Sequence, residues 1–308
     1  MSPFLVVGSV ARDTIHNHLG THEMVLGGSA TFASLAGAFF AQPRLVGVVG
    51  RDFPETEIEL LRTRGVDVRG LQTVDGRTFH WEGRYSPDLT SRETVKTELN
   101  CFADFEPVIP ESYRDTPYVM LGNIHPTLQV KVVEQMRSPR LVIADTMNFW
   151  IDGTPEELRE MLGRIDLLVI NEEEARQLSG LHHIRPVAHR LLQMGPRLVI
   201  IKRGEYGALL FTPNDAFSAP AFPLDEVLDP TGAGDSFAGG LLGYLAREDR
   251  TDIATLRRAV IYGSAVASFC VEGVSVERLI EADVRQVEER FREFARLAHF
   301  ATEEELTT

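Results

Sequence analysis

The sequence predicts an α/β fold, a three-layer sandwich in which helices cover both faces of a mainly parallel central sheet. The first observation is a series of short, almost purely apolar segments, at residues 4–7, 45–49, 118–121, 141–144, 167–170, 198–201 and 208–211. Continuous apolarity is typical of strands that are buried on both faces. The second is that helical patterns separate these segments, at residues 30–40, 55–64, 126–136, 155–162, 172–178 and 186–194. Strands that alternate with helices are typical of a parallel sheet between helical layers.

Two polar and aromatic segments interrupt this alternation and predict a second, smaller sheet. Residues 75–105 contain Thr, Phe, Trp and Tyr with period-2 spacing, and residues 14–26 have a similar character. Such spacing is typical of exposed strands. We therefore expect one domain over residues 1–308, with a small β lid formed by segments of about 14–26 and 75–105. The same strands are equally compatible with pairing between two copies of the chain, which would make a homodimer.

The last segment of the chain predicts an amphipathic helix at residues 283–306. Its apolar side chains are three and four residues apart: Val284, Val287, Phe291, Phe294 and Ala298. This spacing places them on one face of a helix. We expect the helix to pack on the domain and assign it no chemistry.

Composition excludes several classes of function. The net charge of −14 argues against a nucleic-acid-binding face, because such binding relies on Lys and Arg that neutralise phosphates. Cys101 and Cys270 form neither a metal-binding pattern nor a disulfide framework, which fits a reducing compartment. No signal peptide and no apolar run of transmembrane length is present. We expect a cytoplasmic protein with no membrane or nucleic-acid partner.

The most specific motif is the string Asp-Pro-Thr-Gly-Ala-Gly-Asp at residues 229–235. It predicts a tight glycine turn that leads into a helix and delivers the carboxylate of Asp235 to the first helical turn. Backbone N–H groups at a helix start lack partners and attract anions, and small residues let a phosphate approach them. A carboxylate there can take the proton from an attacking hydroxyl. The combination indicates phosphoryl transfer, although a bare Gly-x-Gly-Asp is more often an ordinary strand-to-helix turn.

Polar residues directly follow several of the predicted strands. They are Asn123, Asp145, Asn171 and Lys202, at the ends of four successive apolar segments. Open parallel sheets bind ligands beyond the carboxyl ends of their strands, so we expect these residues to line one cleft. Taken singly, each is also typical of a helix cap or a turn, Asn171 in particular.

Three common nucleotide-binding patterns are absent from the sequence. It contains no Walker-type phosphate loop, no protein-kinase catalytic loop and no Gly-x-Gly-x-x-Gly after the first strand. Instead, the first strand leads into Gly8-Ser-Val-Ala-Arg-Asp13, and a Gly27-Gly28 pair precedes an apolar helical segment. A glycine pair at such a place indicates either close approach of a ligand or a densely packed turn.

Taken together, these motifs resemble the ribokinase-like (PfkB) family of carbohydrate and nucleoside kinases. The resemblance rests on five motifs in the family's order across most of the chain: Gly8-Ser-Val-x-x-Asp13, Gly27-Gly28, Asn171-Glu-Glu-Glu174, Lys202-Arg-Gly-x-x-Gly207 and Asp229-Pro-Thr-Gly-Ala-Gly-Asp235. It implies a Mg²⁺- and ATP-dependent kinase that phosphorylates a hydroxyl of a small sugar, polyol or nucleoside under a lid. A monovalent cation is a further cofactor that the resemblance allows.

The resemblance also implies roles for the matching positions. Asp235 is expected to activate the acceptor hydroxyl, and an anion hole is formed by the N–H groups of Gly232, Ala233 and Gly234. Glu174 is expected to hold Mg²⁺ through water. The nucleotide is expected to contact Asn171, Lys202, Gly204, Gly207 and Thr231.

The acceptor is expected to bind Asp13, Gly27 and Gly28, with Arg84, Asn123 and Asn148 as further contacts because of their strand-end or lid positions. Phe32 stands where many family members carry an Asn that contacts the sugar, so ribose and fructose 6-phosphate are not carried over as acceptors. Two alternatives stay open: a nucleoside kinase of the same family, and a non-catalytic nucleotide- or sugar-binding regulatory protein.

Overall fold

The large sheet is the central layer of the protein. The computed structural model describes residues 1–297. Within these residues the sheet has nine strands, in the order β13-β12-β11-β10-β9-β8-β1-β4-β5. The strands are β1 (Phe4–Val7), β4 (Pro43–Gly50), β5 (Asp67–Val74), β8 (Tyr118–Leu121), β9 (Leu141–Ala144), β10 (Leu167–Asn171), β11 (Leu198–Lys202), β12 (Ala208–Phe211) and β13 (Ala216–Ala219). All neighbours pair in parallel except β11 with β12 and β12 with β13.

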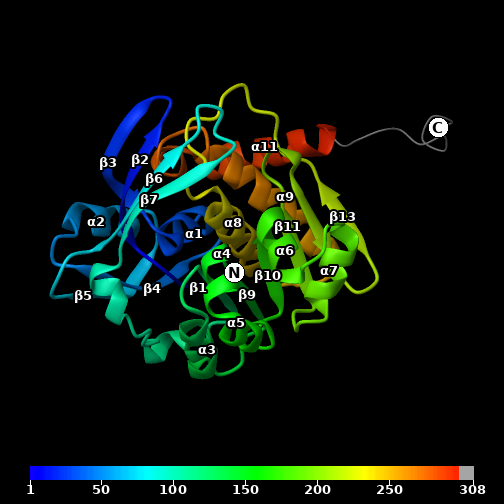
Figure 1. Cartoon of the computed structure of the whole chain (residues 1–308), viewed down its shortest axis with the longest axis horizontal. Helices are drawn as coiled ribbons and strands as arrows, with labels where there is room; N and C mark the ends of the chain where they lie inside the picture. The colour runs from blue at the N-terminus through cyan, green and yellow to red at the C-terminus, as the bar shows by residue number, and fades with distance from the viewer. Residues whose placement is uncertain (298–308) are drawn as a thin grey trace.

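Two hydrophobic cores, one on each face of this sheet, explain the three layers. Alternate residues of a strand point to opposite faces, so Phe4 and Val6 enter one core and Leu5 and Val7 enter the other. The first core is covered by α1 (Ser29–Gly37), α2 (Glu55–Thr63), α8 (Ala233–Glu248), α9 (Ile253–Cys270), α10 (Glu277–Glu281) and α11 (Val284–Leu297). The second is covered by α3 (Pro126–Gln135), α4 (Asn148–Gly153), α5 (Pro155–Leu162), α6 (Glu172–Ser179) and α7 (Ile184–Leu192). This arrangement confirms the predicted fold class (Figure 1).

Three short 3₁₀ helices complete the described secondary structure, at Asn100–Asp104, Glu111–Tyr113 and Gly204–Tyr206. The predicted terminal helix corresponds to α11, in which Val287 and Phe294 are buried and Val284 is exposed. Ala298 and the rest of the predicted helix lie outside the described residues. No helix between residues 1 and 297 is long and apolar enough to cross a membrane.

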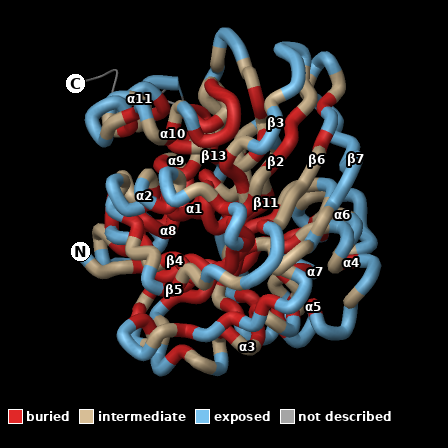
Figure 2. Tube along the Cα trace, turned by 90° about the vertical axis from the view of Figure 1, so that its left-hand side faces the viewer, coloured by how far each residue is buried: buried red, intermediate tan, exposed pale blue. Residues whose placement is uncertain are grey.

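A second sheet, called here the small sheet, stands beside the carboxyl edge of the large one. Its strands are β2 (Ala11–Asn17), β3 (Gly20–Gly27), β6 (Phe79–Tyr85) and β7 (Arg92–Glu98), in the order β3-β2-β6-β7. Segments far apart in the sequence therefore lie side by side (Figure 1). Figure 2 shows that β7 is exposed, whereas an inner strand of the large sheet such as β4 is buried.

Register defines the two faces of the small sheet, because residues directly opposite each other share a face. Asp13 pairs with Trp81, and Tyr85 pairs with Arg92. Trp81 and Tyr85 are four residues apart on β6, so all four side chains are on one face. We call this the inner face. Arg84, next to Tyr85, is on the opposite, outer face.

Candidate active site

A cleft of about 1070 Å³ opens where the carboxyl ends of the parallel strands meet the start of α8. The strand ends contribute Asn123, Asp145, Asn171 and Lys202, as the sequence order of strands and polar residues predicts. Other parts of the wall are Glu174 of α6, the glycine turn with Asp235, and Arg92 of β7. The turn after β11 adds Gly204 and Gly207.

The glycine turn has a conformation that its sequence requires. Gly232 has a φ of 76°, in the left-handed region where a Cβ is unfavourable, and its Cα faces the ring of the buried Phe32. A side chain at position 232 would therefore clash with that ring. Phe32 stands where an acceptor-binding Asn was expected from the family resemblance. In the structure, its ring packs against Gly232 of the glycine turn.

The carboxylate of Asp229 holds the backbone just before this turn in place. It is fully buried and accepts hydrogen bonds from the backbone N–H of Thr231 at 2.9 Å and of Ser275 at 3.1 Å. The helix that follows has no side-chain cap at its start. The N–H of Ala233 donates to the carbonyl of Pro230 at 3.2 Å, so the N–H groups of Gly232 and Gly234 are the ones left for a ligand anion.

Asp235 lies in the first turn of α8 and faces the cleft. Burial and the charge of Asp145 raise the pKa of its carboxyl to about 7, against the opposing charge of Lys202. A carboxyl with a pKa near neutrality can accept and return a proton during a reaction cycle at neutral pH.

Lys202 places its ammonium group directly against the glycine turn. Its Nζ donates to Asp145 Oδ2 at 3.1 Å, and a Cβ on Gly234 would be only 2.7 Å from the same nitrogen. Burial lowers the pKa of Lys202, but the charges of Asp145 and Glu174 outweigh this effect and the net shift is upward. The lysine therefore stays charged next to the turn. The sequence placed Asp145 among the strand-end residues of the cleft but assigned it no role.

Asn171 and Glu174 cap α6 reciprocally. Glu174 N–H donates to Asn171 Oδ1 at 2.8 Å, and Asn171 N–H donates to Glu174 Oε2 at 3.2 Å. Glu174 Oε1 is left for other partners at the cleft wall. Burial and the charge of Asp145 raise the pKa of Glu174 to about 7. Within residues 1–297, no group of three or more His, Cys, Asp or Glu side chains could hold a metal by itself.

Asp13 forms the other end of the candidate site. It is 5% exposed, and its Oδ1 has no hydrogen-bond partner among the described residues. Burial and the charges of Asp229 and Asp235 raise the pKa of Asp13 to about 8. A Cβ on Gly27 would clash with this carboxyl, and Gly28, with a φ of 95°, packs closely on the backbone of Ser9. Gly27 thus makes room for the carboxyl of Asp13, and Gly28 permits the close packing of the turn on the strand that follows Ser9.

The other residues predicted for the site differ in where they lie relative to the cleft. The Thr231 hydroxyl bonds to that of Tyr85 at 2.9 Å, and the Asn123 side chain accepts from Trp150 Nε1 at 2.8 Å. Arg84 is exposed on the outer face of the small sheet. Asn148 begins α4, where its side chain accepts from the next backbone N–H at 3.0 Å. Neither Arg84 nor Asn148 lines the cleft, and neither do Asp13, Gly27, Gly28 and Thr231. Asp13 is nevertheless near enough to Asp235 for the charge of Asp235 to raise its pKa, whereas no hydrogen bond or ion pair among residues 1–297 links the side chain of Arg84 or Asn148 to a residue of the cleft.

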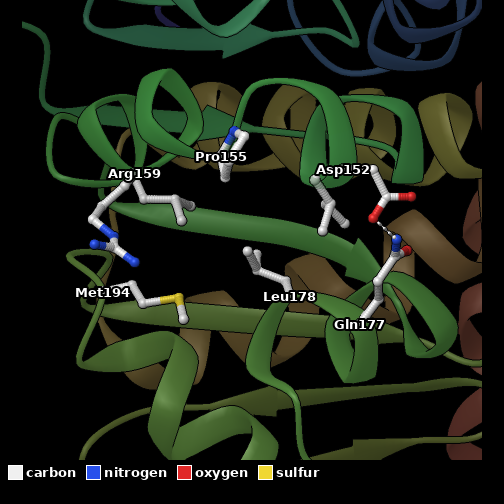
Figure 3. Close-up of a pocket in the computed structure, with 8 residues that line it drawn as sticks. Asp152, Pro155, Arg159, Gln177, Leu178 and Met194 are labelled. Atoms are coloured by element: carbon white, nitrogen blue, oxygen red, sulfur yellow. Dashed lines mark hydrogen bonds between the residues drawn. The ribbon is translucent and has the colours of Figure 1, made fainter.

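A second, smaller pocket of about 210 Å³ lies between α5 and α6 (Figure 3). Its wall is mainly aliphatic, with Leu178 and Met194, and at one end Gln177 Nε2 donates to Asp152 Oδ1 at 2.7 Å. None of the sequence-predicted site residues lines it. The chemistry-bearing groups are therefore concentrated in the large cleft.

Comparison with known proteins identifies the family of the chain. A family model for pfkB family carbohydrate kinases matches residues 119–282. A cytidine kinase from Thermococcus kodakarensis is 31% identical over 256 residues, which cover 80% of this chain and 90% of that protein. A nucleoside kinase from Methanothermobacter thermautotrophicus is 27% identical over 268 residues, which cover 80% of this chain and 78% of that one.

A solved structure supports the fold. A ribokinase II candidate from E. coli, in complex with ATP and Mg²⁺, matches with a TM-score of 0.78 and 20% identity. The match covers 95% of this chain and 100% of that one.

Proposed function

Because this chain belongs to the pfkB family of carbohydrate kinases, which transfer phosphoryl groups to hydroxyls, we propose that it phosphorylates a small sugar, polyol or nucleoside with ATP. The observation that carries the proposal is the position of Asp235. It stands in the first turn of α8, directly after an uncapped glycine turn and close to the charge of Lys202. A proton acceptor and an anion site are thereby adjacent.

In the proposed reaction, the acceptor hydroxyl oxygen attacks the γ-phosphorus of ATP. The new O–P bond forms as the bond from the γ-phosphorus to the β–γ bridging oxygen breaks, and ADP leaves. The hydroxyl proton passes to the carboxylate of Asp235. A pKa of about 7 suits this exchange, since the group is substantially ionised at neutral pH and still basic enough to take the proton.

The glycine turn and Lys202 stabilise the charge of the transferring group. The backbone N–H groups of Gly232 and Gly234 are proposed to receive this charge; that of Ala233 would first have to leave the carbonyl of Pro230. The ammonium of Lys202 lies against the same turn. Fixed donors and a charge in a partly enclosed cleft act where negative charge develops, which is the main source of catalysis in phosphoryl transfer. Gly204, Gly207 and Asn171 are proposed to line the rest of the nucleotide.

The donor set of the cleft fits Mg²⁺. Glu174 has one free carboxylate oxygen and Asp145 is close enough to raise its pKa, so a divalent cation there would relieve the repulsion between the two carboxylates. Mg²⁺ is usually held by one or two carboxylates, with waters and substrate phosphates completing its shell. We propose Glu174 and Asp145 as its holders, with Asn171 fixing Glu174. Bound Mg²⁺ would neutralise phosphate charge.

Asp13 is proposed to hold the acceptor. A buried carboxylate with an unpartnered oxygen is strongly unfavourable unless a donor reaches it, and a hydroxyl group of a sugar or polyol supplies that donor. Gly27, Gly28 and Asn123 would line the same pocket. The small sheet carries Asp13 and acts in this proposal as a lid, which excludes water from the reaction.

A nucleoside is the favoured alternative acceptor. The cytidine and nucleoside kinases named above are similar over most of the chain. A non-catalytic binding protein would not need a carboxyl poised near neutral pH beside an anion site.

An ADP-release assay over sugars, inositols and nucleosides tests the proposal and separates its alternatives. With the best acceptor, Asp235→Asn should lower kcat by about 10²–10⁴-fold, the contribution typical of a general base, with ATP binding retained. Asp75→Asn is a matched control, because Asp75 is an exposed carboxylate paired with Arg51 at the surface. Near-wild-type turnover by Asp235→Asn would refute the role of Asp235. ATP binding with no stimulation by any compound would favour the non-catalytic alternative.

A further inference from the structure

We propose that the small sheet supplies a phosphate-contacting residue, Arg92, which reaches the transferring phosphoryl group in the same cleft as Lys202. The inference rests on the proposed function, since it adds a residue to the same site. Arg92 was not singled out by any sequence motif. Three features of its surroundings support the assignment. They are a hydrogen bond that links the small sheet to the glycine turn, an aromatic ring against the guanidinium, and a positive charge with no carboxylate partner among residues 1–297.

The first feature is the hydrogen bond between the hydroxyl groups of Tyr85 and Thr231. Their hydroxyl oxygens are 2.9 Å apart, and both residues are buried. Thr231 directly precedes the glycine turn, so this end of the small sheet is fixed against the anion site. Arg92 is the cross-strand partner of Tyr85 and shares its face. The register therefore places Arg92 at the turn, and Arg92 lines the same cleft as Asp235 and Glu174.

The second feature is the aromatic ring of Trp81. The guanidinium carbon of Arg92 is 5.4 Å from the centre of the Trp81 ring, within the range of a cation–π contact. The ring lies over Gly83, where any Cβ would clash with it, and its Nε1 donates to Thr94 at 3.3 Å. This packing holds the planar guanidinium on the inner face, beside the cleft that Arg92 lines.

The charge of Arg92 has no carboxylate partner among residues 1–297, unlike that of the other cations of the cleft. Lys202 pairs with Asp145 at 3.1 Å, and Arg203 pairs with Glu172 at 2.6 Å. The pKa values of Asp235 and Glu174 are both raised overall, but the positive charge of Arg92 opposes each rise. Its electrostatic field therefore reaches both carboxyls. An unpaired arginine at the mouth of an anion site is available to phosphate oxygens.

The chemistry of arginine fits this role better than that of lysine. The guanidinium presents parallel N–H donors that match two phosphate oxygens at once, and it stays charged at all relevant pH values. Phosphoryl transfer gains most from groups that contact the charge developing on the transferred oxygens. Because Arg92 belongs to the small sheet, this contact would form only when that sheet is in place over the substrates.

The test compares Arg92→Gln and Arg92→Lys with Lys96→Gln. Lys96 is on the same strand, exposed and paired with Glu98, so its replacement removes a positive charge from the small sheet away from the cleft. With the best acceptor of the ADP-release assay, Arg92→Gln should lower kcat by about 10³-fold, with little change in the acceptor KM. Arg92→Lys should recover part of the rate, and Lys96→Gln should behave as wild type. If Arg92→Gln instead turns over like Lys96→Gln, the assignment is wrong.

A binding measurement keeps the inference separate from the proposed function. AMP-PNP with MgCl₂ and AMP alone are titrated into the wild-type protein and Arg92→Gln by calorimetry. Arg92→Gln should weaken AMP-PNP at least about tenfold while AMP binds unchanged, because AMP lacks the terminal phosphates. Equal weakening of both, or of neither, would overturn the assignment. If no compound is phosphorylated by the wild-type protein, the proposed function fails, but this comparison still tests Arg92.

Discussion

Replacing Asp13 by asparagine is expected to stabilise the folded protein at neutral pH while weakening acceptor binding. Asp13 is 5% exposed, and burial with the charges of Asp229 and Asp235 raises its pKa to about 8 from an ordinary value of 3.8. The folded state therefore binds this proton more tightly than the unfolded chain does. The stabilising effect is complete below pH 3.8 and is lost as pH rises toward about 8.

The magnitude follows from these two pKa values. Each pH unit between them lowers the free energy of unfolding by about 1.4 kcal/mol for one group. At pH 7 the carboxyl of Asp13 therefore lowers it by about 4 kcal/mol relative to acid pH. An asparagine has nearly the same shape and does not titrate, so it removes this loss. Net stabilities of about 5–15 kcal/mol are typical of whole domains, and the effect is large on that scale.

Urea unfolding at pH 5 and pH 7, without ligands, measures the effect. The free energy of unfolding of Asp13→Asn, minus that of the wild type, should grow by about 3 kcal/mol between these two pH values. The dependence on urea concentration should be the same for both proteins. Asp75→Asn, a change at an exposed carboxylate, should show no such growth. A difference that stays constant with pH would refute the reasoning, because it would mean that Asp13 is not held protonated in the folded protein.

Two further outcomes are expected. The ratio kcat/KM should fall below about pH 7 with a slope approaching one per pH unit, because the pKa of Asp235 is raised to about 7 and only its ionised form accepts a proton; a flat profile between pH 5.5 and 8 would contradict this. Gly232→Ala should lower both kcat and the free energy of unfolding, the latter by at least about 1 kcal/mol, because the φ of 76° and the ring of Phe32 both oppose a Cβ. Gly153→Ala, where nothing lies within 4 Å, is its control, and equal melting and turnover of the two variants would contradict the role of the turn.

The strands of the large sheet could be predicted wherever the local sequence is continuously apolar. Four predicted segments, at 4–7, 118–121, 141–144 and 208–211, coincide with β1, β8, β9 and β12. β5 and β13 were not predicted, because these edge strands are only partly buried and mix polar with apolar residues. The start of α7 was also misplaced: Pro186 indicated a helix start, but α7 begins at Ile184. Proline is tolerated throughout the first turn, so it does not mark the first residue.

In the candidate site too, the parts formed by short segments could be predicted from the sequence, and the contacts between distant segments could not. The glycine turn with Asp235 and the cap formed by Asn171 and Glu174 are contained in short strings, and their local structure follows from them. The contact between Lys202 and Asp145 joins residues 57 apart, and the contact between Tyr85 and Thr231 joins residues 146 apart. Neither pairing has a signature in a single sequence.

Arg84 and Arg92 show how sensitive such assignments are to register. Both are arginines of the predicted lid, and the sequence favoured Arg84 as a substrate contact. The faces are decided by the pairing of β6 with β7, which shifts between Glu82 and Gly83. A shift of one residue moves a side chain to the other face of a sheet. The local sequence does not contain this information, so the arginine that lines the cleft emerged only with the structure.

The two carboxyls of the site, Asp13 and Asp235, are carried by separate parts of the molecule. Asp13 is on β2 of the small sheet, whereas Asp235 is on α8 against the large sheet. Under the proposed roles, a productive acceptor has one hydroxyl held by Asp13 and another presented to Asp235. It must therefore contact the small sheet and α8 at the same time, and a change in the position of one relative to the other would change which acceptors fit.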